Sequence, residues 1–307
     1  MSSAPAIEVH GLTKRYGDRA AVDGLSAEIP HGAVAGFIGP NGAGKTTTMA
    51  MLLGLVSPTA GEGRVLGESI GSPERYLYRV GALLESPALW PGLTGVQNLR
   101  VLAKLGRQDE DRIPEMLALV GLADRADDRF GRYSLGMKQR LGIAAALLGD
   151  PELVILDEPT NGLDPAGIRE MRQLIATIAQ QARTVLVSSH ILSELEQVCD
   201  WLIVIDGGRA MYTGPAAGFA THTVTRVTLA PLDHEDLSAL AEVLDRRALR
   251  FEREGDQLSV HLDGGDPRAA AAALNRAAFD AGIDLVEVHI ERPTLESAYL
   301  DRLEAAA

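Results

Sequence analysis

The first part of the chain alternates short apolar stretches with turn residues. Leu25–Ile29 and Ala33–Gly39 have the composition of strands, and turn signals at Gly17–Asp18 and Pro30–Gly32 separate such stretches. Residues 36–56 then read GFIGPNGAGKTTTMAMLLGLV. An apolar run, a glycine-rich segment and a second apolar stretch, in that order, predict a strand, a loop and a helix.

Helical periodicity marks the middle of the chain, and two apolar runs follow it. Between residues 93 and 149 apolar side chains recur about three and four positions apart, which predicts mostly helix. The recurring positions are Val96, Leu99, Val101, Leu102, Leu105, Met116, Leu117 and Val120. The runs LVILD from Leu153 and TVLVSSH from Thr184 resemble strands buried on both faces of a parallel sheet. A helix from about Pro165 to Gln181 is predicted to connect them, which indicates an α/β fold.

The pattern changes after the segment IVIDGGRAMYTGP, which ends at Pro215. Residues 223–304 are predicted to form, in order, a strand, a helix, two strands, a helix, a strand and a helix. This order predicts a small ferredoxin-like α+β domain. We place the boundary near Gly214–Phe219, and expect a first domain of residues 1–219 and an accessory C-terminal α+β domain of residues 220–307.

Composition narrows the class of protein. The 307 residues are 46% hydrophobic, enough for one large domain and one small one, and the net charge is -13. That charge disfavours a nucleic-acid binder, which needs a clustered excess of Lys and Arg, so no nucleic-acid partner is expected. A single cysteine, Cys199, excludes an intramolecular disulfide and a cysteine-rich zinc site within one chain.

The chain carries neither a signal-peptide pattern nor a membrane-span pattern. The opening MSSAPAIEVHGL lacks a basic region followed by a long apolar run. No stretch reaches the roughly 18 consecutive apolar residues of a membrane span. If this protein works at a membrane, we expect another chain to supply the spans.

The segment GPNGAGKT fits the phosphate-binding loop pattern G-x-x-x-x-G-K-[ST] in full. Glycines let successive backbone N–H groups turn toward phosphate oxygens, and the following helix adds its positive dipole end. Lys45 is expected to reach the terminal phosphates of ATP, and Thr46 to ligate Mg²⁺. The alternative is a flexible glycine-rich turn. The nucleotide-binding residues expected here are Gly39, Pro40, Asn41, Gly42, Ala43, Gly44, Lys45, Thr46 and Thr47.

A pair of carboxylates ends the apolar run LVILDEP. Asp157 is placed to meet the Mg²⁺ beside Thr46, and Glu158 to polarise an attacking water. Two adjacent acids at a strand end can also be an ordinary solvated turn; the upstream loop makes the catalytic interpretation the stronger one. The Asn-Lys-x-Asp type of base reader that a GTPase needs is not found in the chain.

Residues 132–165, RYSLGMKQRLGIAAALLGDPELVILDEPTNGLDP, resemble the nucleotide-binding subunits of ATP-binding cassette (ABC) transporters. These carry a signature peptide of the form Leu-Ser-Gly-Gly-Gln; Tyr133–Met137 keeps its Ser and second Gly and departs at three positions. The resemblance covers residues 6–219. It implies a P-loop NTPase cassette with a RecA-like core, a helical subdomain at about residues 90–150 and an antiparallel β subdomain, and an ATPase activity.

The same resemblance implies further site residues. Tyr16 matches the aromatic residue that stacks on adenine, and His190 matches the switch histidine that contacts the γ-phosphate; Lys45, Glu158 and His190 are then the catalytic set. Taken alone, an exposed tyrosine or a histidine at a strand end has no such role. Asp164 matches the loop that faces the partner subunit.

The family also implies partners and location. Its cassettes hold two ATP molecules between antiparallel subunits, so that the signature residues Ser134, Leu135, Gly136 and Met137 act on ATP held by the other subunit. We therefore expect a homodimer, or a heterodimer with a paralogue. The dimer is expected at the cytoplasmic face of the cell membrane, attached peripherally through a separate transmembrane permease.

The segment VGALLESPALW holds Glu85 where most of the family places a glutamine at the end of a strand. Glutamate here resembles exporters of bacitracin resistance and lantibiotic self-immunity. We hypothesise that Glu85 contacts Mg²⁺ or the attacking water. Unlike the amide of glutamine, an ionised carboxylate only accepts hydrogen bonds and carries a negative charge. The alternative is that Glu85 points into solvent. Trp90, Leu93 and the following GVQNL match the surface that receives the permease, although an apolar residue there can equally belong to the local core.

These features predict an ATP-binding and ATP-hydrolysing subunit of an ABC exporter for a drug, peptide antibiotic or similar substrate. The alternative is a soluble, non-transport ABC-type ATPase associated with chromosomes or ribosomes. No long insertion separates Lys45 from Ser134, a second phosphate loop is missing and the chain is acidic, which disfavours that alternative. The sequence does not identify the transported substrate or the permease. The C-terminal domain, with its closing RPTLESAYLDRL, either stabilises the dimer, regulates it or is passive.

Overall fold

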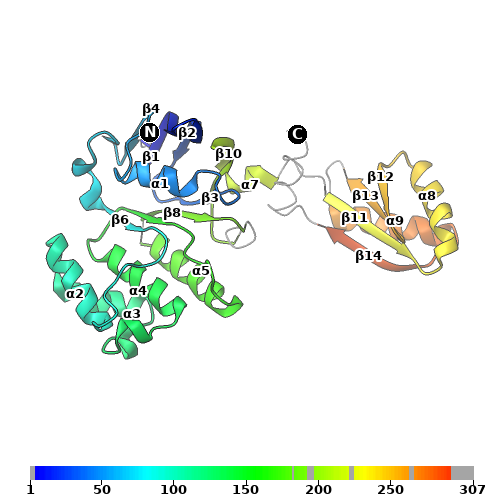
Figure 1. Cartoon of the computed structure of the whole chain (residues 1–307). Helices are drawn as coiled ribbons and strands as arrows, with labels where there is room; N and C mark the ends of the chain where they lie inside the picture. Colours follow the sequence, from blue (N-terminus) through cyan, green and yellow to red (C-terminus); the bar gives the residue numbers. More distant parts are fainter. Residues whose placement is uncertain (1–3, 182, 192–196, 221–224, 263–265, 292–307) are drawn as a thin grey trace. The chain divides into compact units, whose positions relative to one another are not determined.

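The computed structural model describes residues 4–181, 183–191, 197–220, 225–262 and 266–291. The chain divides into two units, Met1–Ala216 and Ala217–Ala307, with the short helix α7 (Ala216–Ala220) at the division (Figure 1). In the described residues, no helix combines the length and apolar character needed to cross a membrane.

An antiparallel sheet forms the start of the first unit. Its strand order is β2-β1-β4-β5, and the hairpin between β1 and β2 turns at Gly17, which has φ 58°. Ile7, Val9 and Leu12 of β1 are buried, whereas Glu8 and His10 face away from the core. The strands are β1 (Ile7–Tyr16), β2 (Arg19–Ile29), β4 (Ala60–Val65) and β5 (Glu68–Ser69).

A second sheet, ordered β10-β9-β3-β8-β7-β6, carries the buried apolar runs. All neighbours in it pair in parallel except β10, which is antiparallel to β9. Every residue of β3, β7 and β8 is buried. For β7 and β8 this is the burial on both faces that their apolar runs predicted. The strands are β3 (Val34–Ile38), β6 (Val80–Leu83), β7 (Leu153–Leu156), β8 (Thr184–Ser189), β9 (Trp201–Asp206) and β10 (Arg209–Pro215).

Helices connect these strands and form a separate group between β6 and β7 (Figure 1). The predicted helical middle of the chain is confirmed: it contains α2 (Gly95–Gly106), α3 (Ile113–Leu119) and α4 (Leu135–Leu147). The two helices of the core are α1 (Lys45–Leu52) and α5 (Pro165–Ala179). Short 3₁₀ turns are η1 (Pro73–Arg75), η2 (Leu77–Arg79), η3 (Glu110–Arg112), η4 (Ala123–Arg125), η5 (Phe130–Arg132) and, in the second unit, η6 (His234–Asp236).

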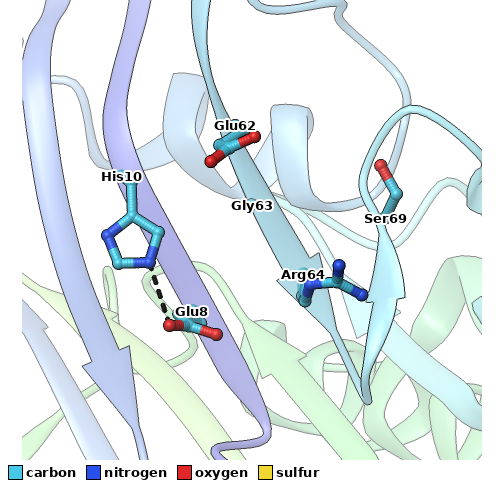
Figure 2. Close-up of a pocket in the computed structure, with 6 residues that line it drawn as sticks. All are labelled: Glu8, His10, Glu62, Gly63, Arg64 and Ser69. Atoms are coloured by element: carbon cyan, nitrogen blue, oxygen red, sulfur yellow. Dashed lines mark hydrogen bonds and ion pairs between the residues drawn. The ribbon is translucent and has the colours of Figure 1, made fainter.

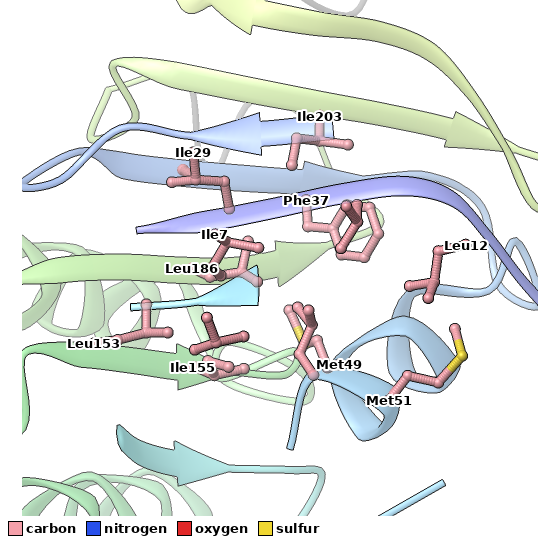
Figure 3. Close-up of a cluster of buried hydrophobic side chains, with 14 of the residues drawn as sticks. Ile7, Leu12, Ile29, Phe37, Met49, Met51, Leu153, Ile155, Leu186 and Ile203 are labelled. Atoms are coloured by element: carbon pink, nitrogen blue, oxygen red, sulfur yellow. The ribbon is translucent and has the colours of Figure 1, made fainter. Parts of the chain in front are cut away.

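The core of the first unit lies between the two sheets and includes α1 (Figure 3). Ile7, Leu12 and Ile29 come from the antiparallel sheet and meet residues of the parallel sheet and helix α1. The labelled partners are Phe37, Met49, Met51, Leu153, Ile155, Leu186 and Ile203, none more than 5% exposed. This packing fixes the position of the loop that leads from β3 into α1.

The second unit is an α+β fold with strand order β12-β13-β11-β14, all pairs antiparallel. Its core is lined by Val227 and Leu229 of the central strand together with apolar residues of both helices. The elements follow the predicted order: β11 (Thr225–Pro231), α8 (Leu237–Asp245), β12 (Phe251–Glu254), β13 (Gln257–Leu262), α9 (Pro267–Asp280) and β14 (Leu285–Glu291). The last predicted helix and the segment RPTLESAYLDRL lie outside the described residues.

Candidate functional site

The glycine-rich loop between β3 and α1 needs glycine at specific positions. A Cβ on Gly39 would lie 2.3 Å from the backbone oxygen of Ile205. Gly44 has φ 104°, and a Cβ there would lie 2.4 Å from the backbone oxygen of Ala21. The loop therefore passes close to two neighbouring backbone segments and leads into the N-terminus of α1, where backbone N–H groups can bind an anion.

Lys45, the first residue of α1, is folded back over this loop. Its side chain is only 6% exposed, and Nζ donates hydrogen bonds to the backbone oxygens of Gly39 at 2.6 Å and Pro40 at 3.3 Å. The same Nζ lies 3.2 Å from Oε1 of Glu158. A buried ammonium group is thus held by neutral acceptors and one carboxylate, in the place where an incoming anion would meet it.

Hydrogen bonds connect Thr46 with the two acids at the end of β7. Thr46 bonds Asp157 directly, and Ser188 joins Asp157 to Glu158. The Thr46 hydroxyl donates to Oδ2 of Asp157 at 2.6 Å, and the Ser188 hydroxyl donates to Oδ1 of Asp157 at 2.5 Å. The backbone N–H of Glu158 donates to Oγ of Ser188 at 2.8 Å. Because Asp157 is 1% exposed and Ser188 fully buried, this network fixes the Asp157 carboxylate with one oxygen toward Thr46.

Glu158 links the loop to the end of the neighbouring strand β8. Its backbone is left-handed, with φ 49°, which turns the side chain away from the direction of β7. One carboxylate oxygen lies beside Lys45, and Oε2 lies 2.8 Å from Nδ1 of His190. Its side chain is only 17% exposed, so a carboxylate that is largely shielded from water contacts both a lysine and a histidine.

A cavity of about 390 Å³ lies against these groups. Tyr16, 53% exposed at the end of β1, lines it at the side of the β1–β2 hairpin, and Lys45 and Glu158 line it with the glycine loop. The lining residues are Tyr16, Arg19, Ala21, Asn41, Gly42, Gly44, Lys45, Thr46, Thr47 and Glu158. An exposed aromatic ring and an anion-binding loop around one cavity fit a nucleotide, with the base at the ring and the phosphates at the loop.

Other residues predicted for the site lie outside this cavity. Glu85 is exposed just beyond β6 with φ 55°, and in the residues that the structure describes it has no hydrogen bond or ion pair. Ser134 caps α4, its Oγ accepting from the Met137 N–H at 3.3 Å, and Asp164 caps α5 in the same way at Gly167. The two caps are adjacent, because a Cβ on Gly136 would lie 3.6 Å from Leu163.

Ser188 is the residue that the sequence reasoning missed. The segment TVLVSSH predicted a buried strand, but a hydroxyl inside a run of buried apolar residues needs a buried partner, and this signal was available. The partner, the acid pair of the neighbouring strand β7, depends on the parallel register of β7 and β8. The register itself could not be obtained from the residue pattern.

Replacing Ser188 by alanine is expected to slow ATP hydrolysis about tenfold, since the two lost hydrogen bonds involve a carboxylate and a buried N–H. Calorimetry should also show a weaker contribution of Mg²⁺ to ATP affinity, an effect that general destabilisation does not produce. Thr184→Val is the matched control, because it removes a buried hydroxyl at the other end of β8, where Thr184 accepts from Gly32. Equal Mg²⁺ dependence in Ser188→Ala and wild type would contradict this positioning role.

A smaller cavity lies on the outer face of the antiparallel sheet (Figure 2). Glu8 and His10 of β1 form a contact at 2.9 Å there, beside Glu62 and Arg64 of β4. Within the described residues, no cluster of three or more His, Cys, Asp or Glu side chains is arranged to hold a metal ion. This cavity of about 200 Å³ has no glycine loop and no base beside a buried cation, so it is not the candidate catalytic site.

Comparisons with known proteins find relatives of this chain. The model of the family described as "ABC transporter" matches residues 22–161. The bacitracin transport ATP-binding protein BcrA of Bacillus licheniformis is 48% identical over 303 residues, 96% of each chain. The lantibiotic transport ATP-binding protein SrtF of Streptococcus pyogenes is 41% identical over 203 residues, covering 66% of this chain and 88% of its own.

The fold agrees with a solved structure as well. A structure described as the ATP-binding subunit of an ABC transporter superposes with a TM-score of 0.63 and 30% sequence identity, covering 70% of this chain and 91% of its own. That coverage is close to the share of the chain that the first unit occupies. The glycine loop, the acid pair and the cavity all lie in this unit.

Proposed function

Because the chain belongs to the ABC transporter family, we propose that it is the ATP-binding and ATP-hydrolysing subunit of an exporter for a peptide antibiotic or similar compound. Proteins of this family hydrolyse ATP to drive transport, and transporter ATP-binding subunits work with separate permease components. One observation carries the proposal: the glycine loop, Lys45 and Glu158 line the same cavity, and the Glu158 carboxylate also contacts His190. The similarity to antibiotic-transport subunits supports export over the soluble chromosome- or ribosome-associated alternative.

ATP binding starts with an exchange of partners at Lys45. A terminal phosphate oxygen replaces Glu158 as the anionic partner of Nζ, which lies 3.2 Å from Oε1 of that residue. The backbone N–H groups at the start of α1 bind the other phosphate oxygens. Tyr16 stacks on the base at the opposite side of the cavity. The exchange releases the Glu158 carboxylate to meet water.

Hydrolysis then uses Glu158 as the general base. Glu158 accepts a proton from water, the water oxygen forms a bond to the γ-phosphorus, and the bond to the bridging oxygen of ADP breaks. His190 holds the carboxylate through its Nδ1 contact at 2.8 Å and orients the γ-phosphate from the same side. Lys45 stabilises the charge that builds up on the phosphate oxygens.

The donor set beside the loop fits Mg²⁺, which prefers hard oxygen ligands. Thr46 and Asp157 supply a hydroxyl and a carboxylate that already lie 2.6 Å apart. Thr46 and Asp157 would hold the ion, which would supply positive charge beside the phosphate oxygens of ATP. Ser188 keeps the Asp157 carboxylate in the orientation that this ligand role requires.

The signature segment and Asp164 are proposed to act on the ATP of a second subunit. Ser134 and Gly136 lie at the N-terminus of the thirteen-residue helix α4, where free N–H groups attract a phosphate. They do not line the cavity of their own chain. A cassette dimer, formed by two copies or with a paralogue, completes each site from both sides.

The permease is proposed to contact the loop after β6, at the cytoplasmic face of the membrane. Asn98 is fully buried and holds this loop: its side chain accepts from the N–H of Trp90 at 2.8 Å and donates to the Trp90 oxygen at 3.1 Å. Trp90 is thereby kept 44% exposed. Glu85 precedes Trp90 on the same loop, and it is proposed to contact Mg²⁺ or the attacking water from there.

Inside-out membrane vesicles that contain this chain and its permease test the proposal. With bacitracin or a lantibiotic as the probe, vesicles should accumulate the probe when Mg²⁺ and ATP are added. Vesicles with Glu158→Gln should accumulate the probe about a thousandfold more slowly, because transport follows hydrolysis. Equal accumulation with and without ATP, for both probes, would contradict export of this class of compound.

A further inference from the structure

The two edge strands of the sheet in the second unit differ in how well they are protected against pairing with a further strand. One edge, β12, is four residues long, and its Glu252, Arg253 and Glu254 are all exposed. Short length and charge are the usual protection of a sheet edge. The other edge, β14, is seven residues long and begins with the apolar pair Leu285 and Val286 (Figure 1). Among the described strands, β14 pairs with β11 alone.

Apolar side chains remain exposed along β14. Val286 is 66% and Val288 is 37% exposed. The register with β11 places Val288 opposite Leu229, on the face that carries the core, whereas Val286 lies at the register shift that follows the pair Ala230–Glu287. Phe279, at the end of the helix α9 that packs along β14, is 72% exposed. An unpaired strand with apolar side chains beside its free N–H and C=O groups is a surface suited to pairing with another strand.

The residue order of β14 is self-complementary. From Val286 it reads Val-Glu-Val-His-Ile, which is symmetric in character about Val288. In an antiparallel pair of two β14 strands centred on Val288, Val286 faces Ile290 and Glu287 faces His289 of the other copy. An imidazole N–H can donate to a carboxylate in either protonation state, so both polar pairs are favourable.

Other registers of the same pair are worse. A pair centred on Glu287 places two carboxylates directly opposite each other, which is destabilising. A shift by one residue moves the apolar side chains of one copy opposite the polar side chains of the other. The charges and the apolar pattern of β14 therefore favour one pairing partner, a second copy of this strand, and one register, centred on Val288.

We propose that β14 is a self-association surface through which two copies of the chain join their C-terminal sheets. A single strand pair is a small interface, and alone it binds weakly. In the cassette dimer of the proposed function, on which this consequence rests, the β14 pair keeps the two chains at a high effective concentration after ATP is hydrolysed. The C-terminal unit then has a role that requires neither nucleotide nor permease.

A single introduced cysteine tests the pairing in the full chain. Opposite residues of an antiparallel pair have Cα atoms about 4.5–5.5 Å apart, within the range of a disulfide. The native Cys199 is 8% exposed and burial raises the pKa of its thiol, so it does not compete. Without nucleotide, Val288→Cys should cross-link about a hundredfold faster than the matched edge control Glu252→Cys, given an effective concentration near 1 mM. Equal rates would overturn the proposal.

A charge exchange in the Val288→Cys chain tests the register without removing apolar contacts. Glu287→Lys or His289→Glu alone places like or unmatched charges opposite each other twice, and each should slow cross-linking about tenfold. The double exchange restores opposite charges and should recover the original rate. Failure of the double variant to recover would overturn the register. These variants leave the cavity of the first unit unchanged, so loss of ATP hydrolysis and loss of cross-linking are separate results.

Discussion

Glu158→Gln is expected to lower the rate of ATP hydrolysis about a thousandfold while leaving ATP affinity within about threefold of wild type. The carboxylate is the only group within reach of both Lys45 and His190 that can accept a proton from water in the described site, and glutamine cannot do so. In the proposed function ATP is bound by the glycine loop and Lys45, which the substitution does not change. Removing the carboxylate also frees Lys45 for the phosphates.

The measurement is phosphate release and equilibrium ATP binding on the same preparations. Glu62→Gln is the control, because Glu62 is an exposed glutamate on the outer face of the antiparallel sheet, away from the loop. Its rate should equal that of wild type. Retained hydrolysis in Glu158→Gln would contradict the assignment of the base, and joint loss of binding and hydrolysis would indicate a structural role for Glu158.

Lys45→Ala is expected to weaken ATP binding about a hundredfold, because charge-assisted hydrogen bonds to phosphate contribute about 3 kcal/mol. The loss should grow with the number of phosphates, so that ATP loses more affinity than AMP. The substitution leaves the 17%-exposed Glu158 carboxylate without its cation. We therefore expect a lower thermal stability as well, which ATP no longer restores.

Isothermal titration with ATP and AMP measures this effect, with Lys104→Ala as the control, since the Lys104 side chain is 67% exposed on α2. Thermal unfolding separates lost affinity from lost fold. An equal loss for ATP and AMP would contradict contact between Lys45 and the terminal phosphates.

The parts of the fold that could be predicted are those that local pattern determines. The buried runs at Leu153 and Thr184 read as parallel strands because sheets covered on both faces leave no polar alternation. The glycine loop could be located because its sequence fits the phosphate-loop pattern in full. The structure gives the reason for two of its glycines, since a Cβ on Gly39 or Gly44 would lie within 2.4 Å of a backbone oxygen. Residue types and their spacing were therefore enough to predict the candidate phosphate loop and the acid pair.

Contacts between distant segments could not be predicted in the same way. Ser188 meets Asp157 only because β8 lies beside β7, and no local pattern gives that neighbour. The pairing of Lys45 with Glu158 likewise joins residues far apart in sequence. The exposed position of Glu85 depends on the left-handed backbone beyond β6, which its sequence neighbours do not require.

The second unit shows the same division between local and distant information. The pattern of apolar and polar residues along 223–304 predicted the order of its strands and helices. The spatial order β12-β13-β11-β14 decides which strands lie at the edges, and it depends on pairing across the whole unit. The exposed apolar edge at Val286 and Val288 therefore became visible only in the structure.

The most direct test of the account is Mg²⁺-dependent phosphate release from ATP by the full chain in membranes that contain its permease, with wild type and Glu158→Gln compared at saturating ATP. The account predicts steady phosphate release by the wild type, none without Mg²⁺, and about a thousandfold slower release by Glu158→Gln at unchanged ATP occupancy. Equal rates for the two chains, or release that does not require Mg²⁺, would contradict it.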